Sequence, residues 1–190
     1  MSSPLKLVIL DRDGVINFDS EHFIKSPDEW KPIPGSIEAI ARLNQNGYRV
    51  VVATNQSGIG RGLFDMATLN AINDKMCGQV FRQGGRIDAV FFCPCTAEQN
   101  CHCRKPDTGM FEDIAVRFHT GLNGVPTIGD SLRDLEAGVK AGCVPVLVLT
   151  GKGKKTQKAG GLPKGTLVFA DLAAAVDHLV AEASSAPAAA

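Results

Sequence analysis

The sequence predicts an α/β fold of three layers with a mostly parallel central sheet. Short aliphatic segments alternate along the chain with longer segments in which apolar residues recur at helical spacing. This alternation is typical of parallel sheets with helices on both faces. The chain has 190 residues, of which 44% are hydrophobic and 21% charged. That length and balance predict a single globular domain over residues 1–183 and a flexible tail over 184–190.

In the first half, each expected strand is a run of aliphatic and β-branched residues that stops at polar or glycine residues, as a buried strand does. Each expected helix carries apolar residues three and four positions apart. The first helix follows Pro34 and Gly35 and stops at Gly47, which fits the usual preferences at helix ends. In chain order, the elements are a strand at 5–10, a helix between Gly35 and Gly47, a strand at 48–53, a helix at 65–82 and a strand at 88–92.

The second half continues the alternation with shorter elements. The helix that begins at Thr108 presents Phe111, Ile114 and Phe118 on one face. A glycine- and lysine-rich segment predicts a loop instead of a regular element. In chain order, we expect a helix at 108–118, a strand at 125–128, a helix at 132–141, a strand at 144–149, a loop at 151–165, a strand at 167–169 and a helix from 171 to about 182.

Polar and chemically reactive side chains follow several of these strands. Asp11 and Asp13 follow the first strand, Thr54 follows the second, Lys105 comes shortly after the third, and Asp130 follows the fourth. Sites in parallel α/β folds lie at the carboxyl ends of the strands. We therefore expect these side chains to meet at one edge of the sheet.

The chemistry expected at that edge is phosphoryl transfer. Of two neighbouring carboxylates one tends to keep its proton, so Asp11 and Asp13 supply an ionised nucleophile and a proton carrier. Asp130 adds a third carboxylate for a hard cation such as Mg²⁺. Thr54 offers a hydroxyl donor and Lys105 a positive charge for the transferring group. Taken singly, each feature is ordinary turn or loop chemistry; their joint order along the chain favours a site.

Four of the six cysteines crowd into residues 93–103. In a cytosolic chain, such clustering favours a metal over disulfides. The segment supplies four thiols and one imidazole, and closed sets of such ligands hold structural zinc. A reduced cluster without metal, or adventitious thiols, is the less favoured alternative.

Four segments resemble, in order, the motifs of the haloacid dehalogenase (HAD) superfamily of phosphatases. They are LDRDGVI, VATNQSG, CRKPDTGMF and IGDSLRDLEAG, and the resemblance spans about residues 5–149. Within the superfamily, DRDGVIN, TNQSGIGRG and the cysteine segment resemble the heptose bisphosphate phosphatases, which are related to histidinol phosphatases. The resemblance implies a Rossmann-like HAD fold. No segment is long enough for a separate cap domain, so we expect loops alone to shape the entrance.

The resemblance also implies a role for each site residue. Asp11 is the nucleophile that forms an aspartyl-phosphate, and Asp13 is the general acid and then the base. Mg²⁺ is held by Asp11, Asp130 and the backbone carbonyl of Asp13. Thr54 and Lys105 stabilise the transferring phosphoryl group. The implied substrate contacts are Asp19, Ser20, Glu21, His22, Asn55, Gln56, Ser57, Arg104 and Ser131.

The cysteine segment departs from the family pattern in one position, because Cys95 stands where the family has a histidine. We therefore expect structural Zn²⁺ on four cysteines, with His102 in place of one of them as the open alternative. Four protein ligands leave no coordination position for catalysis. The expected ligands are Cys93, Cys95, Cys101 and Cys103.

The resemblance implies hydrolysis of the C7 phosphate of a heptose 1,7-bisphosphate. Histidinol phosphate is the alternative substrate, and a zinc-stabilised interaction module without activity is the alternative of another class. The chain has 20 Lys+Arg and 20 Asp+Glu, so its net charge is zero, which disfavours a nucleic-acid partner. No early apolar run is long enough for a signal peptide or a membrane span. We expect a cytoplasmic monomer whose partner is a small phosphorylated sugar.

Overall fold

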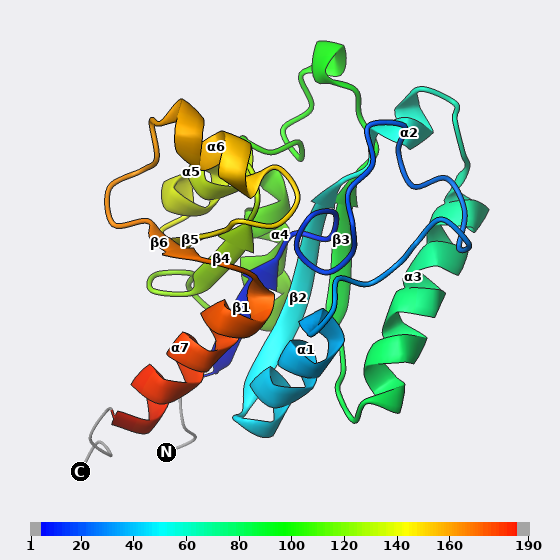
Figure 1. Cartoon of the computed structure of the whole chain (residues 1–190). Coiled ribbons are helices and arrows are strands. Elements are labelled where there is room, and N and C mark those ends of the chain that lie inside the picture. The colour runs from blue at the N-terminus through cyan, green and yellow to red at the C-terminus, as the bar shows by residue number, and fades with distance from the viewer. Residues whose placement is uncertain (1–4, 186–190) are drawn as a thin grey trace.

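Six parallel strands form the central sheet in the order β3-β2-β1-β4-β5-β6, in a computed structural model that describes residues 5–185 (Figure 1). Each neighbouring pair of these strands is parallel. The arrangement confirms the predicted α/β class with a mostly parallel sheet. The strands are β1 (Lys6–Leu10), β2 (Tyr48–Asn55), β3 (Ala89–Cys93), β4 (Pro126–Gly129), β5 (Val144–Val148) and β6 (Leu167–Phe169).

The strand order reverses between β1 and β4. From β1 the chain adds β2 and β3 on one side of the sheet, and it then returns to add β4, β5 and β6 on the other. Connections on the two sides run away from each other at this point. They leave a crevice at the carboxyl ends of the strands, where ligands bind in such folds. Asp11 follows β1 and Asp130 follows β4, so both stand at the crevice.

Helices cover both faces of the sheet. α1, α3 and α7 pack on one face and α4 and α5 on the other, which gives the three layers visible in Figure 1. Among the described helices, none combines the length and the apolar character needed to cross a membrane. The helices are α1 (Ser36–Gln45), α2 (Ser57–Gly60), α3 (Met66–Arg82), α4 (Gly109–Phe118), α5 (Leu132–Lys140), α6 (Gly153–Ala159) and α7 (Leu172–Ser185), with a 3₁₀ turn at Ala97–Gln99.

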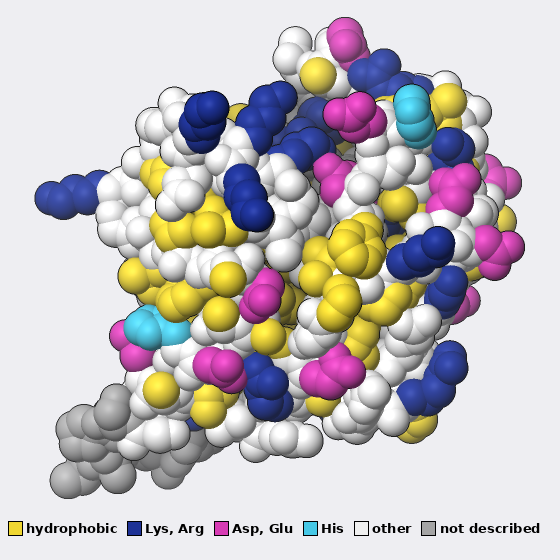
Figure 2. All heavy atoms as spheres, viewed as in Figure 1, with side chains coloured by type: hydrophobic (Ala, Val, Ile, Leu, Met, Phe, Trp, Pro, Cys, Tyr) yellow, Lys and Arg dark blue, Asp and Glu magenta, His cyan; other side chains and the backbone are white. Residues whose placement is uncertain are grey.

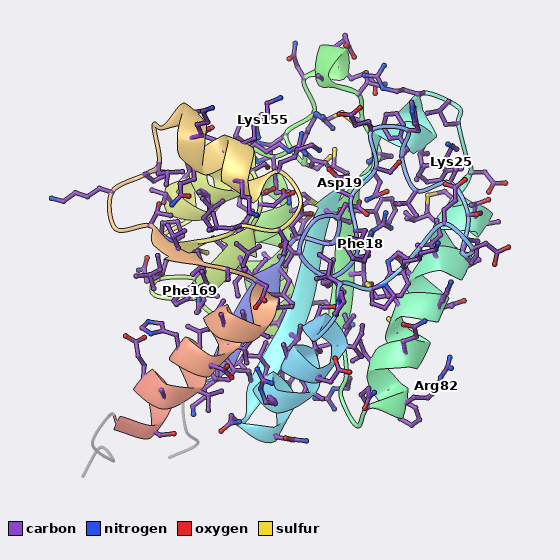
Figure 3. The ribbon with its side chains drawn as sticks, in the orientation of Figure 1. Phe18, Asp19, Lys25, Arg82, Lys155 and Phe169 are labelled. Atoms are coloured by element: carbon purple, nitrogen blue, oxygen red, sulfur yellow. A yellow bond between two sulfur atoms is a disulfide. The ribbon has the colours of Figure 1, made fainter. Side chains whose placement is uncertain are left out.

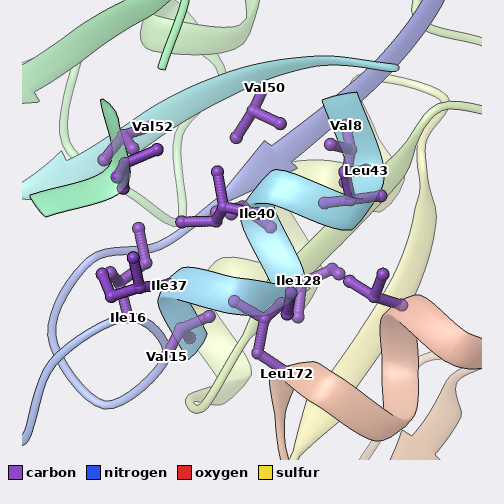
Figure 4. Close-up of a cluster of buried hydrophobic side chains, with 14 of the residues drawn as sticks. Val8, Val15, Ile16, Ile37, Ile40, Leu43, Val50, Val52, Ile128 and Leu172 are labelled. Carbon is purple, nitrogen blue, oxygen red and sulfur yellow. The ribbon is translucent and has the colours of Figure 1, made fainter. Parts of the chain in front are cut away.

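Two hydrophobic clusters hold the layers together. Successive side chains of a strand point to opposite faces, so Val8 of β1 packs in the cluster of α1, α3 and α7, while Leu7 packs in the cluster of α4. Figure 4 shows the first cluster, in which Ile40 of α1 lies against side chains of the sheet. Burial of each such aliphatic side chain contributes roughly 1.5–3 kcal/mol. The clusters therefore fix the strand ends that carry the polar residues.

The segment between β1 and α1 folds back onto the body of the protein. Trp30 is fully buried in it. Nζ of Lys75, on α3, donates to the carbonyl oxygens of Pro27 and Trp30, at 2.5 and 3.0 Å. These contacts anchor the segment, and residues 19–24 come to lie over the carboxyl end of the sheet beside Asp11.

The observed elements differ from the predicted ones mainly at the end of the chain. The segment 151–165, predicted as a loop, contains helix α6. The glycines and lysines of this segment predict a loop, but a contact with the sheet edge stabilises a helix there. Oγ1 of Thr156 donates to the backbone carbonyl of Asp130 at 2.8 Å. The last helix extends to Ser185, farther than predicted. The rest of the predicted tail, residues 186–190, lies outside the described residues.

Candidate active site

Three carboxylates from two strand ends and one helix meet at the crevice. Asp11, Asp130 and Asp134 each have an oxygen within 4.8 Å of one another, and all three side chains are buried. The Asp11 backbone N–H donates to the carbonyl of Ile128 at 2.9 Å, which joins the end of β1 to β4. The structure thus brings together Asp11 and Asp130, which are far apart in the sequence.

Lys105 lies between two of these carboxylates. Its Nζ is 3.0 Å from Oδ1 of Asp11 and 2.7 Å from Oδ1 of Asp134, and it donates to the Ala53 carbonyl at 2.7 Å. Asn55 fixes the backbone of Lys105, because Nδ2 donates to its carbonyl and Oδ1 accepts from its N–H, both at 3.1 Å. Burial alone lowers the pKa of a lysine, but the carboxylates of Asp11 and Asp134 outweigh burial and raise the pKa of Lys105.

Burial affects the pKa values of the carboxylates unequally. It raises the pKa of Asp11 to about 6, although Lys105 opposes the shift, and it raises the pKa of Asp130 to about 7. For Asp13, burial is outweighed by the guanidinium of Arg12 and by hydrogen bonds, so its pKa is lowered. Of the pair Asp11 and Asp13, the nucleophile candidate therefore has the raised pKa in the protein without metal. The pKa values of the two carboxyl groups differ in this direction because the Arg12 guanidinium turns toward Asp13, which the sequence does not reveal.

Thr54 and Gln56 stand next to Asp13. Nε2 of Gln56 donates to Oγ1 of Thr54 at 2.9 Å and to Oδ2 of Asp13 at 2.8 Å. Thr54 is 1% exposed and Gln56 is 5% exposed. The Gln56 amide is thus engaged within the protein, although its side chain borders the cavity above the carboxylates.

Backbone groups surround Asp130 closely. The Lys152 N–H donates to Oδ2 of Asp130 at 2.7 Å. A Cβ added at Gly14 would lie 2.0 Å from the same oxygen, and one at Gly151 would lie 2.2 Å from it. Only residues without a side chain fit at these two positions, so the loops after β1 and β5 together determine where the Asp130 carboxylate points.

A cavity of about 390 Å³ opens above the carboxylates. Figure 2 shows Lys and Arg side chains gathered around a hollow in this part of the surface. Asp19 lies on the loop after β1 (Figure 3), and its Oδ2 is 2.7 Å from Nζ of Lys152. The expected substrate residues that line the cavity are Asp19, Ser20, Glu21, Asn55, Gln56, Ser57 and Arg104.

Two expected substrate residues do not line this cavity. His22 is exposed and borders a separate shallow groove on the outside of the same loop. Ser131 is 9% exposed, and its backbone N–H and hydroxyl both donate to Oδ2 of Asp134, at 3.0 and 2.5 Å. The structure therefore places Ser131 at the start of α5, in contact with a carboxylate instead of the cavity.

Sequence reasoning missed two cations and two apolar residues of the cavity wall. Arg133 lies on the first turn of α5, three residues after Asp130, and Lys152 follows β5. Both positions follow the carboxyl end of a strand, so the rule that identified Asp11 applies to them as well. Phe23 and Ile24 also line the cavity, and no sequence signal identifies them.

The cysteine segment gathers its sulfurs at the end of β3. Cys93, Cys95 and Cys103 have sulfurs within 4.8 Å of one another, and the Cys103 and Cys93 sulfurs are 2.8 Å apart. Cys95 and Cys101 are joined as a disulfide. This corrects the expectation of four free thiols, because the chain brings this pair within bonding distance. A zinc site of four cysteines requires these two as thiolates.

His102 points away from the sulfurs. Its Nε2 is 2.9 Å from Oε2 of Glu112 on α4, and its side chain is 67% exposed. A hydrogen bond to Glu112 and the charge of that carboxylate raise the pKa of His102. The structure thus favours cysteines alone as the zinc-binding set.

The residues present also fit a magnesium ion. Mg²⁺ binds carboxylate oxygens and carbonyls. Burial raises the pKa values of Asp11 and Asp130, and neighbouring carboxylates add to both shifts, so a cation bound there would favour the ionised forms. Both carboxylate oxygens of Asp134 are engaged, Oδ1 by Lys105 and Oδ2 by Ser131, whereas Asp11 pairs with Lys105 through Oδ1. This leaves Asp11 and Asp130 as the carboxylates that suit the cation.

Comparisons with known proteins agree with this arrangement. The family model described as polynucleotide kinase 3 phosphatase matches residues 6–129, and the model described as HAD-hydrolase-like matches residues 102–175. A D-glycero-beta-D-manno-heptose-1,7-bisphosphate 7-phosphatase of Bordetella bronchiseptica is 59% identical, over 94% of this chain and 100% of that protein. One of Pseudomonas aeruginosa is 51% identical, over 92% of this chain and 97% of that protein.

Solved structures are similar over the same length. The crystal structure of D,D-heptose 1,7-bisphosphate phosphatase from B. bronchiseptica, complexed with magnesium and phosphate, has a TM-score of 0.92 and 58% identity, over 94% of this chain and 99% of that chain. The corresponding protein of Burkholderia thailandensis has a TM-score of 0.75 and 58% identity, over 92% of this chain and 98% of that chain.

Proposed function

The chain belongs to the D-glycero-beta-D-manno-heptose-1,7-bisphosphate 7-phosphatase family of the HAD superfamily, and we propose that it hydrolyses the C7 phosphate of that sugar bisphosphate to leave heptose 1-phosphate. The observation that carries the proposal is the buried meeting of Asp11 with Asp130 and Lys105, in a chain 59% identical to a phosphatase of this name. The same arrangement makes a non-catalytic zinc module the weaker interpretation.

Asp11 is the nucleophile of the proposed reaction. Its Oδ1 is held by Lys105, and attack on phosphorus breaks the bond to the sugar oxygen and forms an aspartyl-phosphate. The Lys105 ammonium and the Thr54 hydroxyl stabilise negative charge on the transferring group, since positioning and charge neutralisation dominate phosphoryl transfer. Water then attacks the intermediate, which releases phosphate and restores the Asp11 carboxylate.

Asp13 moves the protons of both steps. Its lowered pKa keeps it ionised in the free protein. An anionic phosphate arriving beside it raises the pKa of a carboxylate, and in the protonated form Asp13 gives its proton to the leaving sugar oxygen. The carboxylate that results takes a proton from the attacking water in the second step.

Asp11, Asp130 and the backbone carbonyl of Asp13 would hold Mg²⁺. When bound, this ion supplies positive charge that offsets the repulsion between a carboxylate nucleophile and an anionic phosphate. Buried carboxylates with raised pKa values, as at Asp11 and Asp130, support this assignment.

We assign a structural zinc to the cysteine segment in its reduced state. The proximity of its sulfurs supports the site. Nη1 of Arg104 donates to the Cys95 carbonyl at 3.0 Å, so the segment supports a cation that lines the cavity. We also propose that the protein acts in the cytoplasm, since thiolate ligands persist under reducing conditions. We further propose that it acts as a monomer. The proposed zinc ligands are Cys93, Cys95, Cys101 and Cys103.

Asp11→Asn tests the proposal. We expect phosphate release from heptose 1,7-bisphosphate to fall by about 10³-fold or more, because an amide does not form the acyl phosphate. The fold is retained, since the change is nearly isosteric, and Asp177→Asn on the exposed face of α7 is the matched control. Steady-state kinetics of the wild-type protein on histidinol phosphate and on heptose 1,7-bisphosphate distinguishes the two candidate substrates. A wild-type rate in Asp11→Asn, or a higher kcat/KM on histidinol phosphate, would contradict the proposal.

A further inference from the structure

Donors from three side chains surround the Asp13 carboxylate. Nε and Nη2 of Arg12 lie 3.2 and 3.1 Å from Oδ1, and Nη2 also lies 3.0 Å from Oδ2. Nδ2 of Asn17 donates to Oδ1 at 2.8 Å, and Nε2 of Gln56 donates to Oδ2 at 2.8 Å. Both oxygens therefore have donors from different directions. Their combined geometry selects one orientation of a side chain that would otherwise rotate about χ1.

The donors are themselves fixed. Arg12 is 0% exposed, and its Nη2 also donates to Oε1 of Gln56 at 3.0 Å. The Gln56 amide is thereby oriented, with its oxygen toward the guanidinium and its nitrogen toward Asp13 and the Thr54 hydroxyl. Nδ2 of Asn17 is tied to the Phe18 carbonyl at 2.9 Å. The network has no freely rotating member.

We infer that Arg12, Asn17 and Gln56 are positioning residues that aim the Asp13 carboxyl group at the leaving oxygen of the substrate. The inference rests on the proposed function, because Asp13 has this task only in a phosphatase. It assigns Gln56 a part different from the expected substrate contact. Misplacing a catalytic group by about 1 Å costs roughly 10²-fold in rate, so a carboxyl group on a turn needs such support.

A purely structural role is the competing explanation. A buried guanidinium is destabilising unless it is paired, and Asp13 is its ion-pair partner in either case. The two explanations differ in their dependence on the leaving group. A sugar alkoxide needs a proton in order to leave, whereas 2,4-dinitrophenolate leaves without one. If only the orientation of the Asp13 carboxyl group is lost, hydrolysis of the sugar phosphate is slowed selectively. If the site is distorted in general, hydrolysis of both substrates is slowed.

The experiment compares kcat/KM for heptose 1,7-bisphosphate and for 2,4-dinitrophenyl phosphate. This ratio covers only the steps up to departure of the leaving group, so the later role of Asp13 as a base does not enter. In Arg12→Met, we expect kcat/KM to fall about 10²-fold on the sugar and less than about 5-fold on the aryl ester. Asp13→Asn removes the proton donor itself, so its loss of kcat/KM on the sugar relative to the aryl ester is the largest that we expect.

Gln56→Met is the second variant, and it decides the question alone if Arg12→Met fails to give a cooperative melting transition. It retains the volume of the side chain and removes the amide. Arg42→Met, which breaks an exposed ion pair with Asp177, is the matched control and leaves both substrates unaffected. An equal loss on both substrates, or no loss, in the folded variants overturns the inference. Activity in Asp11→Asn would instead overturn the proposed function.

Discussion

Asp130 depends on neighbours that carry no functional group. Gly14 and Gly151 come from loops about as far apart in sequence as the domain allows, yet each would place a Cβ within 2.2 Å of Oδ2 of Asp130. Their close approach leaves one orientation for the carboxylate, and the Lys152 N–H holds it there at 2.7 Å. The orientation of the Asp130 carboxylate therefore depends partly on the lack of a side chain at Gly14 and Gly151.

Gly14→Ala tests this dependence, with Gly47→Ala as its control. Both glycines have nearly the same left-handed φ, +85° and +81°, so both variants carry similar backbone strain of roughly 1–2 kcal/mol. Only at position 14 does the new Cβ meet Asp130; at position 47 it meets nothing within 4 Å. We expect Gly14→Ala to raise the Mg²⁺ concentration for half-maximal activity by about tenfold or more, and Gly47→Ala to leave it unchanged. Equal Mg²⁺ requirements in titrations of the two variants would contradict the dependence of Asp130 on Gly14.

The raised pKa values of Asp11 and Asp130 predict how magnesium stabilises the protein at different pH. Both lie above the ordinary 3.8, at about 6 and about 7. Without metal, these two carboxyl groups therefore bind more protons in the folded protein than in the unfolded chain from about pH 4 to pH 7, and their contribution to stability rises as the pH falls through this window. Mg²⁺ needs ionised carboxylates and so acts in the opposite direction.

We accordingly expect saturating Mg²⁺ to raise the Tm clearly at about pH 8 and much less at about pH 5.5. Thermal denaturation with and without the metal measures the difference. Asp11→Asn should reduce the effect at the higher pH, because it removes one of the two carboxylates. An increase in Tm of the same size at both pH values would contradict the assignment of these carboxylates to Mg²⁺.

At the residue scale, the sequence predicts the acids better than their environments. Asp11 and Asp130 are predictable because a parallel sheet collects whatever follows its strands. The protonation of Asp11 relative to Asp13 is not, because it depends on the direction in which Arg12 turns. The position of His22 is set by loop contacts that no residue pattern encodes. Ser131 is different, because Ser131 followed three residues later by Asp134 is a capping-box pattern that predicts its place at the start of α5.

At the element scale, the start of α5 couples helix formation to the site. Asp134, in its first turn, accepts from the N–H and the hydroxyl of Ser131 and also pairs with Lys105. One carboxylate thus satisfies the end of the helix and orients the cation that holds Asp11. This explains why Asp134 is 2% exposed and still ionised: burial raises its pKa, but Lys105 and other partners outweigh burial and lower it.

Ser131→Ala is expected to destabilise the protein by about 0.5–2 kcal/mol, the usual cost of losing a hydroxyl at a helix start. Urea unfolding gives the free-energy difference. We expect KM for the substrate to change by less than about threefold, because the hydroxyl faces Asp134 and not the cavity. Unchanged stability together with a large rise in KM would instead identify Ser131 as a substrate contact, as the family resemblance implies.

We expect the cysteine segment to couple metal binding to substrate binding. Arg104 lines the cavity and donates to the Cys95 carbonyl, so removing zinc from the reduced protein should raise KM by about tenfold and change kcat little. Cys101→Ser should lose the metal, and Cys77→Ser, outside the segment on α3, should retain it. Metal analysis and kinetics under saturating Mg²⁺ measure both effects. Full activity and an unchanged Tm after zinc removal would refute the link.

Most elements are predictable from pattern alone, but the short helices α2 and α6 are not, and α6 shows why. Strands such as β1 are buried on both faces and read as unbroken aliphatic runs, whereas α6 is short, rich in lysine, and mostly exposed. Its place depends on Thr156 and the Asp130 carbonyl, a contact between α6 and a residue that follows β4, far away in the sequence. The disulfide of Cys95 and Cys101 is local, but the same cysteine spacing also suits a metal site, so the sequence does not distinguish the two.

At the scale of the whole molecule, the fold makes an open site. The strand order reverses beside β1, and short loops, not a cap domain, form the walls of a cavity of about 390 Å³. A cavity of this size suits a small ligand. Its lining carries as many acids as cations: Asp11, Asp13, Asp19 and Glu21 balance Arg104, Lys105, Arg133 and Lys152. Two of these cations form ion pairs, Lys105 with Asp11 and Asp134, and Lys152 with Asp19.

This charge balance predicts discrimination against nucleic acid, although the family model described as polynucleotide kinase 3 phosphatase matches residues 6–129. A protein that grips a phosphodiester backbone needs unpaired Lys and Arg along a path, and its binding then falls steeply with salt. Here 20 Lys+Arg are balanced by 20 Asp+Glu. We expect kcat/KM for a 3′-phosphorylated DNA oligonucleotide to be about 10³-fold below that for heptose 1,7-bisphosphate, with little change between about 50 and 200 mM salt. Phosphate-release assays with both substrates measure this difference. A rate on the oligonucleotide that is comparable to the rate on the sugar, and that falls steeply with salt, would contradict the prediction, because it would show that the protein binds a phosphodiester backbone.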